Sequence, residues 1–292
     1  MRTIALILTA ATLTMPIAAQ AKPAPLPAAI FTDPVHSKTH PARMEVLHVP
    51  SGGVEINGVA YLAAGPGPHP TLLICHGWPG NEKNLDLAQA VRRAGWNAIT
   101  FNYRGSWGSA GTFRFAQNPE DARAVLAYLR DGTNAAKLGI DPKRIAMVGH
   151  SMGGWVTAMV AGKDDGLLGA ALISAANMGA RGEGDRGEVI KLAASNAETL
   201  AGTSPEQMAD ELIANHAAYN FLTMAPGLAH KPLLILSSDD GLAPGTDELA
   251  KAVRAAGSKQ VRSLHVATDH SWSDRRIRLQ AEVLRWLQTL AK

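Results

Sequence analysis

The sequence predicts an α/β fold, in which a mostly parallel central sheet carries helices on both faces. From residue 71 onward, short apolar runs alternate with segments of helical period. The runs are apolar at every position, which is typical of parallel strands buried on both faces. A chain of 292 residues that is 46% hydrophobic and only 18% charged can also bury one large core. One α/β domain with an insertion accounts for this length.

The first two strands are expected to pair differently from the rest. Residues 45–49 and 54–62 alternate apolar and polar side chains around a Gly52-Gly53 turn, which predicts an antiparallel hairpin. The later strands are expected at 71–75, 97–101, 144–148, 168–173, 232–236 and 261–266. Helices are expected at 84–94, 119–130, 152–161, 246–256 and 275–290.

The interval 177–229 interrupts this alternation, because it contains no apolar strand. It is first rich in glycine and charge, and then helix-like over 189–200 and 205–217. A structureless loop of this length is uncommon inside a compact domain. We therefore predict a helical insertion that forms a cap over the edge of the sheet.

The N-terminus has the pattern of a secretory signal. The first residues, MRTIALILTAATLTMPIAAQA, combine an early Arg2, an apolar run and the small-x-small site Ala19-Gln20-Ala21. A membrane anchor is the alternative, but polar residues and Pro16 interrupt a run already short for a span. We expect cleavage after Ala21, a secreted or periplasmic protein without stable membrane association, a flexible lead-in at 22–43 and a domain at 44–292.

Charge and cysteine content exclude several classes of partner and cross-link. The formal net charge is +3, and no basic run or aromatic-basic stripe indicates nucleic acid. The single cysteine, Cys75, allows no intramolecular disulfide. It ends an apolar run, so we expect a small core residue rather than a nucleophile.

The stretch GHSMGG at 149–154 holds Ser151 between glycines, after an apolar run and before a predicted helix. This is the pattern of a nucleophile elbow, in which a sharp strand-to-helix turn presents the serine hydroxyl to a substrate. The motif alone is a weak signal, so its context decides. The elbow requires an oxyanion loop upstream and then an acid and a histidine downstream, in that order.

The required companions are present at the ends of predicted strands. HGWPG at 76–80 follows the strand 71–75, SSDDGLAP at 237–244 follows the strand 232–236, and TDHSW at 268–272 follows the last strand. Since carboxyl ends of parallel strands meet at one edge of the sheet, these segments are expected to lie together where ligands bind.

With these motifs and NYRGSWGSAG at 102–111, the chain resembles the α/β-hydrolases of the serine esterase type over about residues 44–290. The dienelactone hydrolase and prolyl-oligopeptidase-like branches are the most similar in motif. The resemblance implies the α/β-hydrolase fold and a secreted serine hydrolase that cleaves a small-molecule carboxylic ester through an acyl-enzyme. It implies no metal and no organic cofactor.

The chemistry assigns a role to each candidate residue. A neutral histidine can deprotonate a serine near pH 7 if a carboxylate fixes its tautomer, so Ser151 is expected as nucleophile and His270 as base. The backbone N–H groups of Trp78 and Met152 are expected to hold the oxyanion. Adjacent residues in an extended segment face opposite sides, so only one of Asp239 and Asp240 can orient His270. The resemblance favours Asp240, because the family pattern places the acid a few residues past the strand and four before a proline, here Pro244.

The histidines near these motifs are expected to have structural rather than catalytic roles. His76 is expected in the oxyanion turn, His150 with its side chain away from the elbow, and His265 packed in its strand. Arg104 and Trp107 either line the acyl pocket or anchor a loop, and the sequence does not decide between these two interpretations.

Two further functions remain as alternatives. Prolyl-oligopeptidase-like peptidases share these motifs but usually carry a large propeller domain, for which fewer than about fifty residues are left between the signal and the core. A catalytically dead α/β-hydrolase used as a binding protein would have lost a triad member. Ser151 at the elbow argues against haloalkane dehalogenases and epoxide hydrolases, which use aspartate there. The sequence does not name the substrate.

Overall fold

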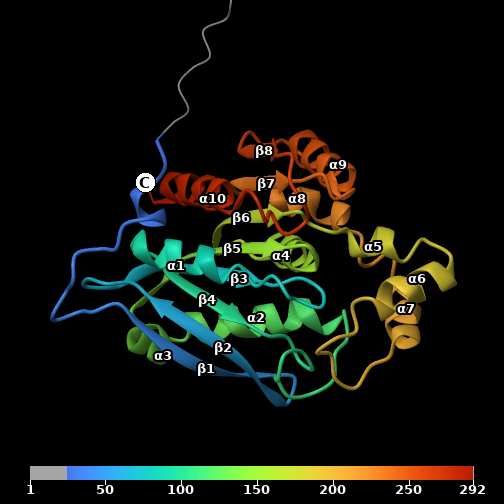
Figure 1. Ribbon diagram of the computed structural model, residues 1–292, viewed down its shortest axis with the longest axis horizontal. Helices are drawn as coiled ribbons and strands as arrows, with labels where there is room; N and C mark the ends of the chain where they lie inside the picture. Colours follow the sequence, from blue (N-terminus) through green and yellow to red (C-terminus); the bar gives the residue numbers. More distant parts are fainter. Residues whose placement is uncertain (1–24, 292) are drawn as a thin grey trace, which may run out of the picture.

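A computed structural model describes residues 25–291. Eight strands form one sheet in the order β1-β2-β4-β3-β5-β6-β7-β8 (Figure 1). The strands are β1 (Arg43–Ser51), β2 (Val54–Leu62), β3 (His69–Cys75), β4 (Asn97–Phe101), β5 (Ile140–His150), β6 (Leu167–Ile173), β7 (Leu233–Ser237) and β8 (Val261–His265).

The pairing follows the predicted change of rhythm. β1 and β2 form an antiparallel hairpin, and β2 pairs antiparallel with β4. Every later pairing, from β4-β3 to β7-β8, is parallel. The predicted fold class, a mostly parallel sheet of the α/β-hydrolase type, is therefore confirmed. Gly52 and Gly53 close the hairpin with φ of 56° and 83°, a conformation that glycine adopts without strain.

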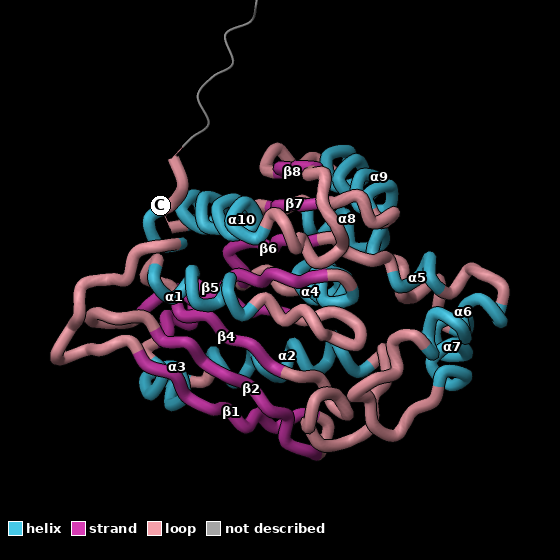
Figure 2. Tube along the Cα trace, in the orientation of Figure 1, coloured by secondary structure: helices cyan, strands magenta, loops and turns pink. Residues whose placement is uncertain are grey.

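Helices cover both faces of the sheet (Figure 2). One face carries α1 (Leu85–Arg93) and α10 (Arg276–Leu290), which contact each other. The other carries α2 (Gln117–Arg130), α4 (Met152–Ala161) and α9 (Ala243–Ala255), with α3 (Gly132–Leu138) beyond α2. The sequence did not predict α3. Asp131 caps it by accepting from the N–H groups of Thr133 and Asn134, and Gly139 ends it at φ 63°.

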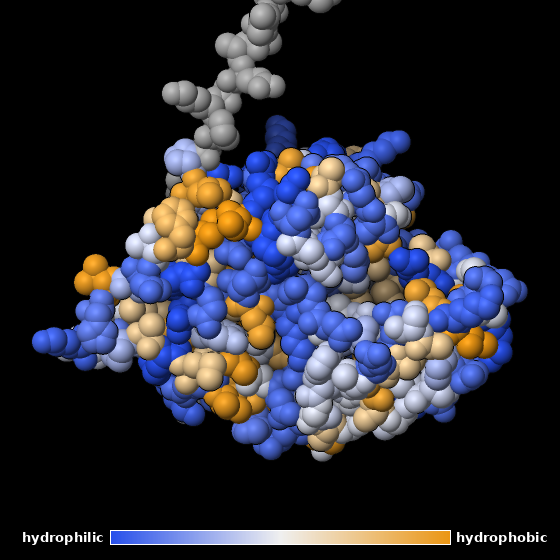
Figure 3. Space-filling model, viewed as in Figure 1, coloured by the Kyte–Doolittle hydropathy of each residue, from blue (hydrophilic) through white to orange (hydrophobic). Residues whose placement is uncertain are grey.

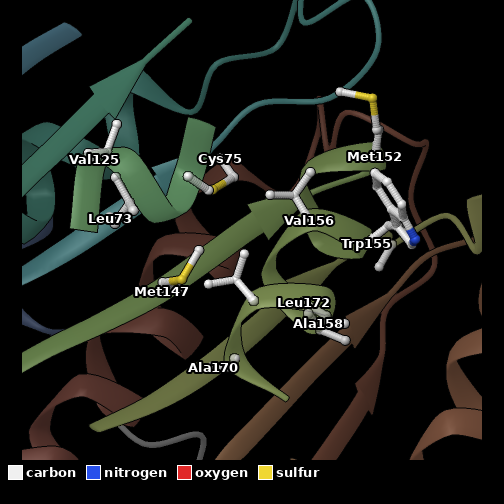
Figure 4. Packing of buried hydrophobic residues seen from close by; sticks show 14 of the residues in the cluster. Leu73, Cys75, Val125, Met147, Met152, Trp155, Val156, Ala158, Ala170 and Leu172 are labelled. Atoms are coloured by element: carbon white, nitrogen blue, oxygen red, sulfur yellow. The ribbon is translucent and has the colours of Figure 1, made fainter. Parts of the chain in front are cut away.

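The core lies in two layers, one on each side of the sheet. In Figure 4 the side chain of Val156 in α4 points toward Cys75 of β3, within one of these packed layers. Cys75 lies in this layer, and burial raises the pKa of its thiol to about 12. A thiol that stays protonated is no nucleophile, so Cys75 is a core residue as predicted.

Between β6 and β7 the chain forms α5 (Met178–Arg181), α6 (Arg186–Ala194), α7 (Pro205–Ala214), the 3-10 helix η2 (Phe221–Met224) and α8 (Ala225–Leu228). The first three project as a lobe at one side of the molecule, whereas η2 and α8 return beside α4 and α9 (Figure 1). Met208, Leu212 and Phe221 belong to the same core cluster as the sheet. Trp155 of α4 also donates from Nε1 to the carbonyl of Tyr219 at 2.7 Å. The insertion is thus packed onto the body.

Within residues 25–42, the described part of the chain ahead of β1, the short 3-10 helix η1 (Ala28–Ile30) is the only helix or strand. Arg93 of α1 holds it by donating to the carbonyls of Ala29 and Ile30 at 2.6 and 3.0 Å. The predicted signal, 1–21, lies outside the described residues. Within 25–291, no helix is both long and apolar enough to cross a bilayer.

Candidate active site

Ser151 occupies the turn between β5 and α4. Its backbone has φ 57° and ψ −122°, a conformation that L-residues rarely adopt. The turn is held by the N–H of Ser151, which donates to the carbonyl of Ile173 at 2.9 Å. Strain of this kind persists only where surrounding structure imposes it. The strand-to-helix turn lies where the elbow motif predicts it.

The glycines of the motif allow the surrounding backbone to approach the turn. A Cβ on Gly149 would lie 1.9 Å from the carbonyl oxygen of Gly153, and one on Gly153 would lie 2.1 Å from that of Cys75. A Cβ on Gly154 would lie 2.4 Å from the Cβ of Ala175. No side chain fits at these distances, so close packing of β5, α4 and their neighbours explains the glycines.

Asp240 and His270 meet as the sequence predicts. His270 Nδ1 lies 2.7 Å from Asp240 Oδ2, with the Asp240 side chain only 4% exposed. An ionised carboxylate can only accept, so Nδ1 carries the proton and Nε2 is left as an acceptor. This is the tautomer that a general base next to a serine needs.

The environment keeps Asp240 ionised. Burial raises the pKa of its carboxyl, but hydrogen bonds from His270, the N–H of Leu242 and Ser238 outweigh burial and lower it to about 2. Ser238 in turn shares a 2.7 Å hydrogen bond with Ser174, which accepts from Nε1 of the fully buried Trp272. Sequence reasoning missed this supporting chain of hydroxyl groups.

Asp239 faces the other way. Its side chain is 60% exposed and accepts from Nε2 of His265 at 2.9 Å. His265 is therefore half-exposed and paired, and the expectation that it packs within its strand is wrong. β8 is an edge strand of the sheet and has a neighbouring strand on one side only, which leaves the His265 ring in solvent.

The HGWPG loop lies directly against the elbow. A Cβ on Gly77 would lie 3.0 Å from the Cβ of Ser151, and a Cβ on Gly80 would lie 2.2 Å from Nδ1 of His76. His76 is buried, Nδ1 donates to the carbonyl of Gly77 at 2.8 Å, and burial lowers its pKa to about 4. The ring of Trp78 packs edge-on against Phe115 at 4.9 Å between centroids.

All five predicted site residues line one cavity of about 220 Å³: Trp78, Ser151, Met152, Asp240 and His270. Ala176, Met178, Arg181, Leu192, Asn196 and Leu242 complete its walls. The surface is hollowed in this region, between the body around α9 and the lobe of α5, α6 and α7 (Figure 3). A larger cavity of about 390 Å³ lies at the opposite, amino end of β3 and β5 and contains none of the motif residues.

His150 differs from the expectation that its side chain points away from the elbow. Its Nε2 donates to the carbonyl of His270 at 2.8 Å, and the two rings lie 4.6 Å apart. Burial, and then the nearby His270, lower the pKa of His150 to about 3. The neutral ring therefore braces the loop that carries His270.

Arg104 and Trp107 act as loop anchors and do not line the cavity. Arg104 donates from Nε to the buried Asp121 at 2.6 Å and from Nη2 to Glu120 at 2.8 Å. Trp107 donates from Nε1 to the carbonyl of Pro79 at 2.8 Å, which ties this loop to HGWPG. Arg114 reaches the insertion, where it donates to the carbonyl of Gly202 at 2.8 Å.

Four cavity residues come from the insertion and were not singled out from the sequence: Met178, Arg181, Leu192 and Asn196. No local motif marks them, because their approach to Ser151 depends on how the insertion folds back. Within residues 25–291, no group of three or more His, Cys, Asp or Glu side chains could hold a metal ion.

A family comparison agrees with this geometry. The sequence matches the family model described as Alpha/beta hydrolase family over residues 72–288. The chain belongs to the alpha/beta hydrolase family. A search of curated protein sequences finds no significant match.

Solved structures share the fold of this alpha/beta hydrolase at low sequence identity. An esterase of Pyrobaculum calidifontis is 18% identical with a TM-score of 0.66, and the match covers 87% of each chain. The Pyrococcus furiosus esterase Pf2001 is 16% identical with a TM-score of 0.61, covering 85% of this chain and 93% of that one. The acylaminoacyl peptidase of Pyrococcus horikoshii is 15% identical with a TM-score of 0.63, covering 86% of this chain but 44% of its own.

Proposed function

We propose that this alpha/beta hydrolase is a serine esterase that cleaves small carboxylic esters through an acyl-enzyme. The observation that carries the proposal is the convergence of Ser151, His270, Asp240, Trp78 and Met152 on one cavity, with Asp240 on Nδ1 of His270. Esterases among the structural neighbours agree with this assignment.

In the proposed reaction, Oγ of Ser151 attacks the ester carbonyl while its proton moves to Nε2 of His270. The tetrahedral oxyanion is held by the backbone N–H groups of Trp78 and Met152; that of Met152 has no partner inside α4, because it begins the helix. Collapse breaks the ester C–O bond and the alcohol leaves with the proton. Water then attacks the acyl-enzyme while one of its protons moves to Nε2 of His270. Collapse of the second tetrahedral intermediate returns that proton to Oγ of Ser151 and releases the acid.

Replacing Ser151 tests the proposal. Ser151→Ala should abolish labelling by a fluorophosphonate probe and lower turnover of p-nitrophenyl esters by several orders of magnitude, since only binding and oxyanion contacts remain. Ser263→Ala, on the exposed edge strand, is the matched control. A Ser151→Ala variant that retains a tenth of wild-type turnover would contradict the assignment of Ser151 as nucleophile.

The same experiment separates the alternatives. A peptidase, as the structural likeness to an acylaminoacyl peptidase allows, would label with the probe and prefer acyl-peptide anilides over the matching esters. A binding protein on the same fold would neither label nor turn over either substrate class.

We also infer export to the periplasm or the medium from the signal pattern in residues 1–21. The mass of the protein recovered after expression of the full chain should correspond to an N-terminus at Lys22. Recovery of the intact chain from the cytoplasm would contradict export.

A further inference from the structure

The cavity around Ser151 contains one permanent cation. Arg181 of α5, a half-buried residue of the insertion, lines this cavity. Within residues 25–291, its guanidinium makes no hydrogen bond or ion pair, and its main chain alone is bonded, to Asn177. A guanidinium carries five donors in a fixed planar fork. None of its nitrogens is fully buried, so water reaches these donors until a ligand with acceptor oxygens takes its place.

The packing of α5 determines which way Arg181 faces. Gly179 and Gly182 lie three residues apart and lean on the following segments: their Cβ atoms would lie 2.4 Å from the carbonyl oxygen of His216 and 2.2 Å from that of Leu212. Met178 and Arg181, also three residues apart, line the cavity on another side of the turn. The glycines thus seat α5 closely, and this presents Arg181 to the substrate space.

The acidic residues of the insertion near α5 have partners of their own. Asp210 pairs with Arg186 at 2.7 Å, Glu188 pairs with Lys191 at 2.8 Å, and Asp185 caps α6. Glu183 lies 4.0 Å from His216. None of these four acids forms an ion pair with the guanidinium, so they do not neutralise it.

The acid of the cavity itself is also engaged. Asp240 accepts from Nδ1 of His270 at Oδ2 and from the N–H of Leu242 at Oδ1. A move of Asp240 toward the guanidinium would break the contact that orients the histidine. The cation therefore remains available to a ligand.

We propose that Arg181 binds a carboxylate of the substrate, so that the enzyme prefers esters that also carry a free carboxylate, such as half-esters of short dicarboxylic acids. This rests on the proposed esterase function. A single guanidinium matches a single negative charge, and its fork matches the two oxygens of a carboxylate. Apolar Met178, Leu192 and Leu242 suit a short alkyl chain between the ester and the charge. A cavity of about 220 Å³ has room for such a short acyl part.

Matched pairs of esters test the preference. Monoethyl succinate, glutarate and adipate are compared with ethyl esters in which an isopropyl group replaces the carboxylate, so that each pair differs in charge at nearly equal shape. The readout is the ratio of kcat/KM for the acidic ester to that for its neutral partner. This ratio is measured on one preparation, so a variant that is partly unfolded still gives an interpretable value.

The wild type is expected to favour the acidic ester of at least one pair by about 10- to 100-fold, the effect of one charge-assisted hydrogen-bonded pair. Arg181→Gln and Arg181→Met should each remove that preference. Arg123→Gln is the control, because Arg123 is an exposed arginine on α2 outside the cavity and its loss changes net charge equally. Ratios equal within about threefold in wild type and both Arg181 variants would overturn the proposal.

A binding measurement separates this inference from the esterase assignment. In the Ser151→Ala background, which makes no acyl-enzyme, calorimetric titration with glutarate should show binding that Arg181→Gln abolishes and Arg123→Gln retains. If neutral esters are turned over but neither assay shows an effect of the Arg181 substitutions, the carboxylate site is contradicted and the esterase assignment is not. Absence of all ester turnover and of probe labelling contradicts the esterase, and glutarate binding then still decides the role of Arg181.

Discussion

Two adjacent carboxylates at the end of β7 do different work because their side chains leave the chain in opposite directions. Asp240 turns inward, is 4% exposed and holds Nδ1 of His270, whereas Asp239 turns outward and pairs with His265 in solvent. The inward carboxylate is also supported by the hydroxyl of Ser238. A buried hydrogen-bonded acid orients a base, while an exposed pair contributes little to stability.

Exchanging each carboxylate for an amide separates the two. Asp240→Asn should lower kcat by as much as about 10⁴, because the amide favours the wrong tautomer of His270 while leaving the fold intact. Asp239→Asn, the matched control, should keep nearly full activity. Steady-state kinetics on a p-nitrophenyl ester, with circular dichroism of both variants, checks this; equal losses in the two would place the acid elsewhere.

The site residues nearest the strand ends were predictable, since a motif places each one at a carboxyl end of a parallel strand. Ser151, Asp240 and His270 belong to this group, and the structure brings them to one cavity. Arg181 and the Ser174 hydroxyl were not predictable in this way. Their neighbours are set by a fold-back of fifty residues and by side-chain packing beneath the acid, which no short pattern encodes.

At the scale of elements, α4 links the elbow to the insertion. It is buried on nearly all sides, between the sheet and the segment around η2. The indole of Trp155 is fully buried, and its Nε1 donates to the carbonyl of Tyr219. The same contact therefore attaches the insertion to the body and supports the helix that begins at Met152, directly after Ser151.

Removing this indole N–H should loosen the attachment. Trp155→Phe is expected to lower the free energy of unfolding by about 0.5–1.5 kcal/mol more than Trp286→Phe, because it removes one of the two hydrogen bonds that the carbonyl of Tyr219 accepts, the other coming from the N–H of Gly179. Trp286 is a suitable control: it is 4% exposed, and its Nε1 has no hydrogen-bond partner within residues 25–291. Urea unfolding of both variants measures the difference, and equal losses would show that the hydrogen bond contributes nothing.

Most long elements followed from sequence periodicity, because burial on both faces forces continuous apolar runs and the helices between them carry an apolar stripe. The exceptions are short. α5 and α8 span four residues each, and helices of that length form only through tertiary contacts. α3 has seven residues, too few to show an apolar period. Its sequence signals are the Asp131 cap at the start and Gly139 at the end.

For the molecule as a whole, two buried histidines beside the site are expected to lower the free energy of unfolding in acid. The carboxyl edge of the sheet holds two histidines buried at 4% exposure or less, His76 against HGWPG and His150 against the His270 loop. Burial holds both rings neutral, with pKa values lowered to about 4 and about 3. In the unfolded chain, both rings would regain the ordinary histidine value of about 6.5.

This difference predicts how stability depends on pH. Between about pH 6.5 and pH 4 the unfolded chain binds protons at both rings and the folded protein does not, so acidification favours unfolding. Each histidine contributes a slope of up to about 1.4 kcal/mol per pH unit in that window. Denaturant titrations at pH 7, 6 and 5 should show the free energy of unfolding falling as pH falls. The slope should be shallower in His76→Gln and in His150→Gln, since an amide does not titrate, whereas His36→Gln, an exposed histidine of the lead-in, should leave it unchanged. A free energy of unfolding that is constant from pH 7 to pH 5 would mean that the two rings accept protons in the folded protein, and the neutral brace behind His270 would then be wrong.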